Sequence, residues 1–396
     1  MKRQKIAICW FVLCVVALGC GSEANEYTST FSAGGSTIGG SDATSSTDGG
    51  SPPLGGGGSG GFGGAGGDEA SPCAGYFHSD AIWCQSVENQ PLAPQSAEAT
   101  AATGDWGMGK FQIDFSIVLT TLDENNPGAM KTFQETGDFF FPDCDHTPVP
   151  FPLSGSSLEA ETGWDCMGGG DCHAVIMDEQ SGFLYEQWRA VNPGSENPYQ
   201  GGCLRRFKPA ITKGTLQSDI QCTTAIADGQ PLWPMMLTPE EVLGDTIDHA
   251  SRFILPNSKI AQHLFVYPAT HSTYPTSLQM PALPYGAWLR LKWIDGQIDQ
   301  WVQANKPGNV YLGRILRALR KHGMILSDGG NVALTWANDS NRSVKWGEVG
   351  IDSHSLIGNP PIMPTDFDWI IPPGVDPADF HTVPMTNDCK RIPLNE

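Results

Sequence analysis

The sequence predicts a mainly β fold of the α+β class: an antiparallel, sandwich-like body with a few docked helices and disulfide bridges. Three observations predict it. Short segments with strand patterns, bounded by Gly, Pro or Asn, recur through residues 73–396; only two segments carry clear helix signals; and eight cysteines fall within the same residues. Because no linker or internal repeat divides these residues, we expect one folded domain.

The expected strands follow one another along the chain. Residues 111–119 alternate apolar and polar side chains, which indicates a strand with one buried face. Residues 173–177 and 183–188 flank a turn that contains Gly182, so we expect a hairpin. Further strands are expected at 247–255, 263–267 and 287–294, and a second hairpin at 324–326 and 332–336.

Two helices are expected to dock on the sheet. Thr238 offers an N-cap hydroxyl, Pro239 takes the first helical position and Glu241 stands three residues after the cap, so a short helix should begin here. Between residues 310 and 322, apolar side chains share one face, and Gly323 ends the helix. Cations in its last turn suit the helix dipole, and we interpret them as a solvated terminus in preference to an anion site.

Residues 1–19 have the pattern of a secretory signal peptide: three cations, then an uncharged run too short to span a bilayer comfortably. The run ends at Cys20 in a pattern that resembles the bacterial lipobox, whose cysteine is lipidated, although Ala17 stands where Leu is usual. The prediction is a lipoprotein of the cell envelope with the membrane as its partner; an ordinary secreted protein and an uncleaved anchor are the alternatives. Gly21 in place of aspartate favours the outer membrane or cell surface.

Residues 20–72 are predicted to be a flexible linker. They consist of Gly, Ser, Thr and Asp with almost no large apolar side chain, so they cannot bury enough surface to offset the entropy lost on ordering. The hydrolase pattern G-x-S-x-G occurs at residues 57–61, with no strand before it and no helix after it. We discard this match as a consequence of composition.

The net charge of -20 excludes one class of function. Such a chain repels nucleic acid at long range, and it carries no basic stripe of the kind that phosphate recognition requires. We therefore predict no nucleic-acid partner. The acidity is interpreted as a soluble surface, with attraction of a cationic substrate as the alternative.

The cysteines predict up to four disulfides. Of eleven, two leave with the signal peptide and Cys20 would carry the lipid, which leaves an even number in an exported chain. The short separations from 73 to 84 and from 166 to 172 make local loops plausible, but the connectivity stays open. The candidates are Cys73, Cys84, Cys144, Cys166, Cys172, Cys203, Cys222 and Cys389.

Asp, Cys and His gather at residues 143–146 and 165–173, where they could in principle bind zinc. None of the spacings is the C-x-x-C type of a structural zinc site, and thiols in an oxidising compartment pair with each other. Disulfide-stapled loops are the preferred interpretation. We predict no metal and no cofactor.

Carboxyl groups are the candidate catalytic residues, because glycoside cleavage needs one protonated and one ionised acid about 5 to 9 Å apart. Glu186 lies in an apolar strand, where burial would raise its pKa and suit it to act as the acid. Asp248 or Asp328 would be the second carboxyl group. His173, on the adjoining strand of the hairpin, and His271, in a Ser/Thr/Tyr/Pro segment, complete the candidate set.

Each candidate has a structural alternative. By the period of two in a strand, Asp248 and Arg252 share a face, which favours a structural ion pair. Glu186 could instead be solvated, and a lone histidine such as His271 is more often structural. The twelve tryptophans are likewise assigned to core packing first, with stacking on sugar rings as the alternative.

Four segments carry a resemblance: residues 171–186 with D-x-H and L-Y-E, 247–253 with I-D-H-A-x-R-F, 267–271, and 316–330 with G-M-I-x-x-D-x-G. Together they resemble a family of uncharacterised secreted bacterial proteins, sometimes found alongside sugar-binding modules. The resemblance covers about residues 165–346. It implies an extracellular location and supplies no reaction.

Two functional hypotheses follow. The first is a surface-anchored, polysaccharide-directed glycoside hydrolase, and the second is a non-catalytic glycan-binding or adhesion module. A hydrolase requires two carboxyl groups that face one cleft, whereas a binding module needs only an exposed aromatic platform. The sequence leaves open whether the protein is an enzyme at all.

Overall fold

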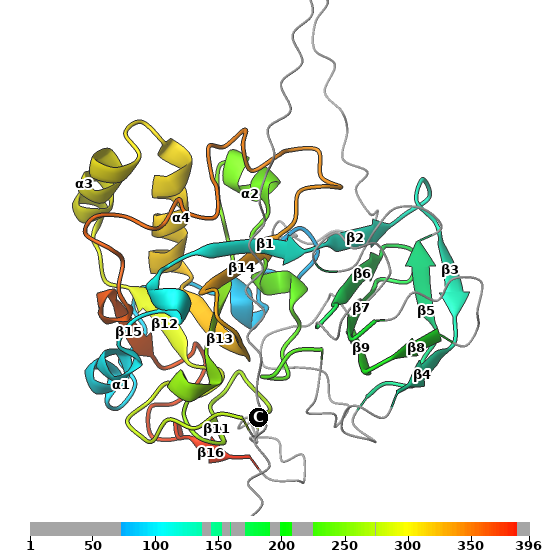
Figure 1. Ribbon diagram of the computed structural model, residues 1–396, viewed down its shortest axis with the longest axis horizontal. Coiled ribbons are helices and arrows are strands. Elements are labelled where there is room, and N and C mark those ends of the chain that lie inside the picture. The colour runs from blue at the N-terminus through cyan, green and yellow to red at the C-terminus, as the bar shows by residue number, and fades with distance from the viewer. Residues whose placement is uncertain are drawn as a thin grey trace, which may run out of the picture. The chain divides into compact units, whose positions relative to one another are not determined.

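A six-stranded mixed sheet carries the largest hydrophobic core (Figure 1). The first strand runs parallel to its neighbour and the third runs parallel to the fourth, whereas the fifth is antiparallel to both strands beside it. The predicted mainly β, α+β class is confirmed, and parallel pairs occur beside the expected antiparallel ones. The order across the sheet is β1 (Ile113–Ile117), β14 (Leu334–Ala337), β10 (Ser251–Leu255), β13 (Met324–Gly329), β12 (Trp288–Leu291) and β15 (Phe367–Ile370).

A second sheet of four strands begins where β1 ends. The expected strand at 111–119 is broken at Val118, after which the chain enters the second sheet, so one segment joins the two sheets. The hairpin expected at 173–188 is confirmed, because its two strands pair antiparallel. The order is β2 (Leu119–Leu122), β6 (Ala174–Asp178), β7 (Phe183–Trp188) and β9 (Cys203–Phe207).

Helices α3 (Asp295–Asn305) and α4 (Val310–Lys321) pack against each other, and the apolar face of α4 is buried, as its pattern predicted. The Asn309 side chain accepts a hydrogen bond from the Leu312 amide and so begins α4. Gly323 follows the helix at a φ of +74°, and a Cβ there would lie 2.6 Å from the Leu289 carbonyl oxygen, so only glycine fits.

Helix α2 (Pro239–Leu243) has the predicted capping box, in which Thr238 and Glu241 exchange hydrogen bonds, and it packs against α4. Helix α1 (Ser96–Thr103), which like α3 was not predicted, packs against β15. Its buried side chains are small, so little hydrophobic periodicity marks it in the sequence.

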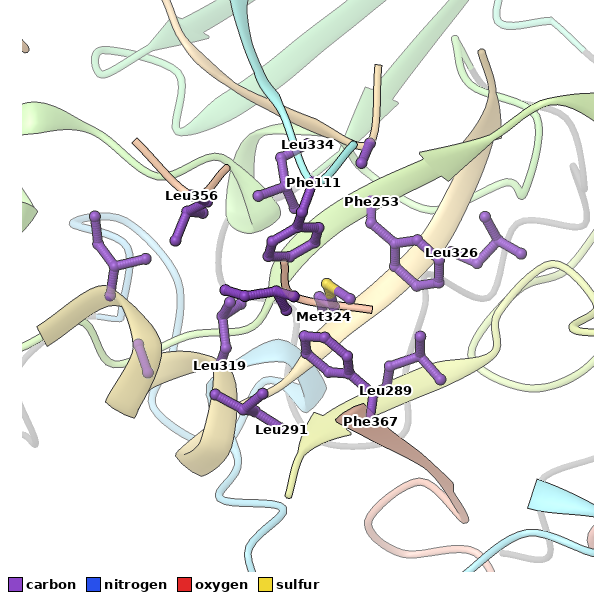
Figure 2. Packing of buried hydrophobic residues seen from close by; sticks show 14 of the residues in the cluster. Phe111, Phe253, Leu289, Leu291, Leu319, Met324, Leu326, Leu334, Leu356 and Phe367 are labelled. Carbon is purple, nitrogen blue, oxygen red and sulfur yellow. The ribbon is translucent and has the colours of Figure 1, made fainter. Parts of the chain in front are cut away.

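The core of the large sheet consists almost entirely of hydrocarbon. Phe253, Met324 and Phe367 point into it from three strands of the sheet, and Leu319 meets them from α4 (Figure 2). Eight of the ten described tryptophans are buried, as their assignment to packing expected. The side chains of this core are therefore closely packed around the large sheet.

Smaller elements complete the described structure. Three two-stranded sheets pair β3 (Gly128–Lys131) with β5 (Val149–Pro152), β4 (Phe133–Glu135) with β8 (Tyr199–Gly201), and β11 (Leu264–Phe265) with β16 (Val383–Pro384). The 3₁₀ helices are η1 (Ile82–Cys84), η2 (Gly107–Gly109), η4 (Trp233–Met235), η5 (Asn257–Lys259) and η6 (Pro364–Asp366).

This computed structural model describes residues 73–136, 144–152, 159, 171–190, 199–207, 225–273 and 275–385. All of them belong to the unit Gly66–Glu396, one of two into which the chain divides by its internal contacts. The predicted signal peptide, Cys20 and the linker lie outside the described residues. None of the helices in the described ranges is both long and apolar enough to cross a membrane.

Besides the strand broken at Val118, several expected elements differ from the structure, among them the strand expected at 263–267, of which only Leu264–Phe265 forms. The hairpin at 324–336 is wrong, because β10 lies between β13 and β14 in the sheet. The strand at 247–255 begins only at Ser251, and that at 287–294 ends at Leu291, after which Ile294 caps α3. In each case the pattern located the strand, but its partners or limits depend on distant residues.

Disulfides form in the described part as expected. Cys73 bonds to Cys84 and Cys144 bonds to Cys203, with Cα atoms 5.9 Å and 5.3 Å apart. Cys172 is also disulfide-bonded. Because such bonds persist in oxidising compartments, they indicate an extracytoplasmic protein. The remaining candidates, Cys166, Cys222 and Cys389, lie outside the described residues.

Candidate functional site

Polar side chains converge where the two sheets meet. Residues from β1, β7, β10 and β13 contribute, together with Glu159, a histidine immediately before β6 and an aspartate from the loop that precedes η4. Their hydrogen bonds and mutual electrostatic effects place them together. We call this set the junction cluster: Asp114, Ser116, Glu159, His173, Glu186, Asp228, Arg252, Ser327 and Asp328.

Two irregularities in the large sheet lie at serines of this cluster. Phe253 and Ile254 are adjacent in β10, yet they pair with Leu326 and Asp328 of β13. Ser327, between those two partners, is therefore an extra residue in β13. A similar register shift occurs in β1 between Asp114 and Ile117, around Ser116. Such bulges change the direction of a side chain and are common beside active sites.

Arg252 is the cation shared by the cluster. Its side chain is 3% exposed; Nε donates to Ser327 Oγ at 3.0 Å and Nη2 contacts the Asp328 carboxylate at 3.3 Å. Its charge also acts to lower the pKa of Asp114 and Glu159. Breaking such a buried pair from one side leaves an uncompensated charge.

A chain of hydrogen bonds links Asp114 to His173. The Ser116 hydroxyl lies 2.7 Å from Asp114 Oδ2 and 3.4 Å from Glu159 Oε1. The other oxygen of Glu159 lies 2.9 Å from Nδ1 of His173. Because one hydroxyl contacts both carboxyl groups, their nearest oxygens are no farther apart than those of paired glycosidase acids, which lie about 5 to 9 Å apart.

His173 is held as a cation. Its Nδ1 faces the Glu159 carboxylate and its Nε2 faces the Ala225 carbonyl at 3.0 Å. Both partners can only accept, so both ring nitrogens must carry protons. Burial alone would lower the pKa of His173, but the hydrogen bond and charge of Glu159 raise it to about 9.

The two carboxyl groups beside Ser116 have opposite shifts. Burial raises the pKa of Asp114, and the charge of Glu159 adds to the rise. Burial also opposes ionisation of Glu159, yet its hydrogen bond to His173 and the charge of that imidazolium together lower its pKa to about 2. Such divergence marks a proton donor beside an ionised carboxylate. Burial likewise raises the pKa of Asp328, against the charge of Arg252.

Glu186 contributes to the cluster from β7 and is fully buried. Its carboxyl oxygens accept hydrogen bonds from the Leu232 amide at 2.8 Å and the Trp233 amide at 2.9 Å. Burial raises its pKa to about 7, against these two donors. Since its oxygens are occupied by the backbone at the start of η4, Glu186 fixes this loop and cannot reach a substrate.

Asp228 is a second fully buried carboxyl group, and it lies in the loop that Glu186 fixes. Its side chain accepts hydrogen bonds from the backbone and side chain of Gln230, and burial raises its pKa to about 8. His271 Nδ1 lies 3.0 Å from the Ala227 carbonyl oxygen, so this predicted residue contacts the loop that carries Asp228.

Within the described part of the chain, Asp248 forms no hydrogen bond with a residue of the junction cluster. Its carboxylate accepts from the Ala74 amide at 3.4 Å, and it precedes β10, so the strand period does not apply. The ion pair expected between Asp248 and Arg252 is replaced by that between Arg252 and Asp328. Of the predicted residues, Glu186, Asp328 and His173 lie in the cluster.

Sequence reasoning missed the residues nearest to the proposed chemistry. Asp114 and Ser116 stand two apart in the predicted strand at 111–119, so two polar side chains on one face were a visible signal. Glu159 and Asp228 carry no such signal, because loops bring them into place. Among the described residues, no group of three or more His, Cys, Asp or Glu is arranged to hold a metal ion.

No family model matches the chain, and no curated protein or solved structure matches it. The resemblance to secreted bacterial proteins therefore stays a prediction, and the function is argued from the site.

Proposed function

We propose that the protein is an exported glycoside hydrolase that cleaves a polysaccharide with paired carboxyl groups. The observation that carries the proposal is the chain from Asp114 through Ser116 and Glu159 to His173, in which the two acids have opposite pKa shifts. This pair replaces Glu186 and Asp248, which the sequence favoured.

Each residue of the pair has a distinct part in the proposed reaction. Asp114 keeps its proton to a higher pH than an ordinary aspartic acid and donates it to the leaving oxygen. Glu159, ionised by the adjacent His173 imidazolium, acts from the other side as nucleophile or as base toward water. Both are half-buried, so they combine a low dielectric with access from outside.

Arg252 and Asp328 support this pair. The Asp328 side chain is 20% exposed and its carboxylate is held by Arg252, which leaves it able to accept a hydrogen bond from a sugar hydroxyl. Arg252 influences the pKa of both Asp114 and Glu159, so its loss would change the protonation of the pair.

The second candidate, a glycan-binding module without catalysis, has less support. Its expected feature was an exposed aromatic platform. None of the described tryptophans is fully exposed, and only Trp188 and Trp293 are partly exposed. The indole of Trp188 donates to Asp171 and carries Arg189 on one face, 4.6 Å from the ring centroid. Binding without product formation would favour this candidate.

The test is product analysis of the mature protein on a panel of polysaccharides. Wild type should release oligosaccharides, and Asp114→Asn should reduce the rate by about 10²- to 10⁴-fold, the usual contribution of general acid catalysis. Asp248→Asn is the matched control, because Asp248 lies outside the cluster, and it should keep the wild-type rate. Equal rates for wild type and Asp114→Asn would overturn the assignment.

The envelope location has its own test. We propose that Cys20 carries a lipid and that residues 1–19 are removed. Cys20→Ser should then move the protein from the membrane fraction to a soluble or unprocessed form. Unchanged membrane association with an unlipidated, uncut N-terminus would contradict this proposal.

A further inference from the structure

A cavity of about 350 Å³ lies beside α4. Residues 245–247, which lead from α2 toward β10, form one wall, and the α4 side chains Val310, Arg314, Arg317 and Lys321 form the other. We call it the α4 cavity. Its volume falls at the lower end of the range of small-molecule sites, about 300 to 1,000 Å³. No residue of the junction cluster lines it.

Cations dominate the α4 cavity, although the chain as a whole is strongly acidic. Arg314 donates to the Val242 and Leu243 carbonyls at 2.6 Å and 3.1 Å, so its guanidinium is fixed in place, and no carboxylate of the described residues pairs with it. Within the described part of the chain, the Lys321 ammonium group forms no ion pair or hydrogen bond. Two positive charges are therefore available to a ligand.

The other charged groups of the α4 cavity would contribute less to the binding of an anion. Arg317 is paired with Asp295 and Asp299 on α3, so its charge is largely compensated. Asp245 is an exposed acid in the opposite wall and opposes an anion there. Apolar contact comes from Val310, which is 66% exposed, and from the buried Ile247.

A second cavity of about 360 Å³ shows why the first one differs. It too is lined by three cations, Arg290, Lys292 and Arg320. There, however, Asp368 pairs with both Arg290 and Lys292, and Glu88 pairs with Arg320. Because all three cations of this second cavity are already paired with Asp368 or Glu88, a bound anion would gain little from them.

We infer that the α4 cavity binds the carboxylate of an acidic sugar, with Lys321 and Arg314 on the anion and Val310 and Ile247 against the ring. A guanidinium held in place by two carbonyls and an ammonium group unpaired among the described residues match a carboxylate, and the exposed valine offers a surface for the apolar side of a pyranose. The carbohydrate part of this inference rests on the proposed function, whereas the anion part rests on the cavity alone.

The experiment is a calorimetric titration of the full mature chain at low ionic strength with glucuronate, glucose and benzoate. Glucuronate should bind saturably and more weakly as salt is added, and neutral glucose should not bind. Binding of benzoate without glucuronate would overturn the sugar assignment, and absence of binding by both acids would overturn the site.

Substitutions locate the binding. Lys321→Gln and Arg314→Gln should each weaken glucuronate binding by about tenfold or more, as expected for one charge-assisted hydrogen bond. Asp245→Asn should tighten it, because a repelling charge is removed. Lys306→Gln, an exposed cation paired with Asp352 elsewhere, is the control and should bind as wild type.

Two features keep the test decisive. Lys321 is exposed, so Lys321→Gln is expected to fold, and circular dichroism checks this. Asp114→Asn should slow hydrolysis by about 10²-fold or more yet leave glucuronate binding unchanged, which separates failure of this site from failure of the proposed function. Wild-type affinity in both Lys321→Gln and Arg314→Gln would overturn the inference.

Discussion

The core around Phe367 and the junction cluster both draw residues from the large sheet but are built from different interactions. The core is hydrocarbon packed from several strands and α4 (Figure 2). Its buried Tyr285 stays neutral because burial raises the pKa of the phenol. The junction cluster consists of carboxyl groups, a buried arginine, an imidazolium and two bulge serines. The core thus provides stability that depends little on pH, whereas the cluster holds charges whose ionisation depends on one another.

The largest effect is expected from a cavity in the core. Phe367→Ala removes a fully buried ring that contacts Trp106 and Phe111. The free energy of unfolding should fall by about 3 to 5 kcal/mol, the usual cost of such a truncation. Urea denaturation measures it. A smaller loss of unfolding free energy in Phe367→Ala than in Glu186→Gln would contradict this difference between the core and the cluster.

Glu186→Gln tests the buried link between the cluster and its loop. The glutamine would keep one acceptor oxygen, but its NH2 group would lie against the Leu232 amide, which now donates to both carboxyl oxygens, and so would disturb the bonds from Leu232 and Trp233. A cost of about 1 to 3 kcal/mol is expected, the range for an unsatisfied buried group. Hydrogen exchange of those two amides should accelerate, whereas Glu124→Gln on an exposed turn should change nothing; equal exchange in both variants would argue against the anchoring role.

The pH dependence of stability should distinguish the cluster from the core. The folded pKa of His173 is about 9 against 6.5 unfolded, so its contribution is full below pH 6.5 and is lost as pH rises through 9. The raised pKa values of Glu186 and Asp228, about 7 and 8, act in the same direction. Glu159 acts oppositely, since its contribution is present above pH 4.5 and is lost as pH falls through about 2.

Unfolding measured from pH 4.5 to 9 should therefore show stability that falls as pH rises. In His173→Gln the part of this slope that His173 contributes above pH 6.5 should disappear. His381→Gln, at an exposed position, should keep it. A slope that is the same in His173→Gln and wild type would contradict the assignment of His173 as a buried cation.

The smallest effect is expected at the surface. Lys306 and Asp352 form an ion pair whose side chains are 38% and 61% exposed. Lys306→Gln should change the free energy of unfolding by less than about 1 kcal/mol, because solvent and salt screen such a pair. A larger loss by thermal unfolding would mean that charge at the surface contributes as much as charge at the junction.

The parts of the fold that the sequence predicted are those set by neighbouring residues. The face of α4, the capping box at Thr238 and the hairpin of β6 and β7 depend on local spacing, and all three are confirmed. The hairpin at 324–336 was wrong because β10 is inserted between its strands. A local pattern cannot show which distant strand will pair, since the pairing depends on the packing of the whole sheet.

The residues of the candidate site also divide into those with a local sequence signal and those that only the folded chain brings together. Glu186 was selected for its apolar strand, and its burial is as inferred, but the Leu232 and Trp233 amides occupy its oxygens. Asp248 was selected on a strand that begins three residues later. Glu159 could not be found, because only the folded chain brings its carboxylate to His173.

The most direct test of the account is the pH–rate profile of wild type and Asp114→Asn on a polysaccharide that the panel identifies. In the wild type, kcat/KM should be highest at acid pH and should fall as pH rises through the raised pKa of Asp114, above the ordinary value of 3.8. Asp114→Asn should be slower by about 10²-fold or more on the acid plateau. A variant with the wild-type rate and the wild-type alkaline limb would contradict the assignment of Asp114 as the proton donor.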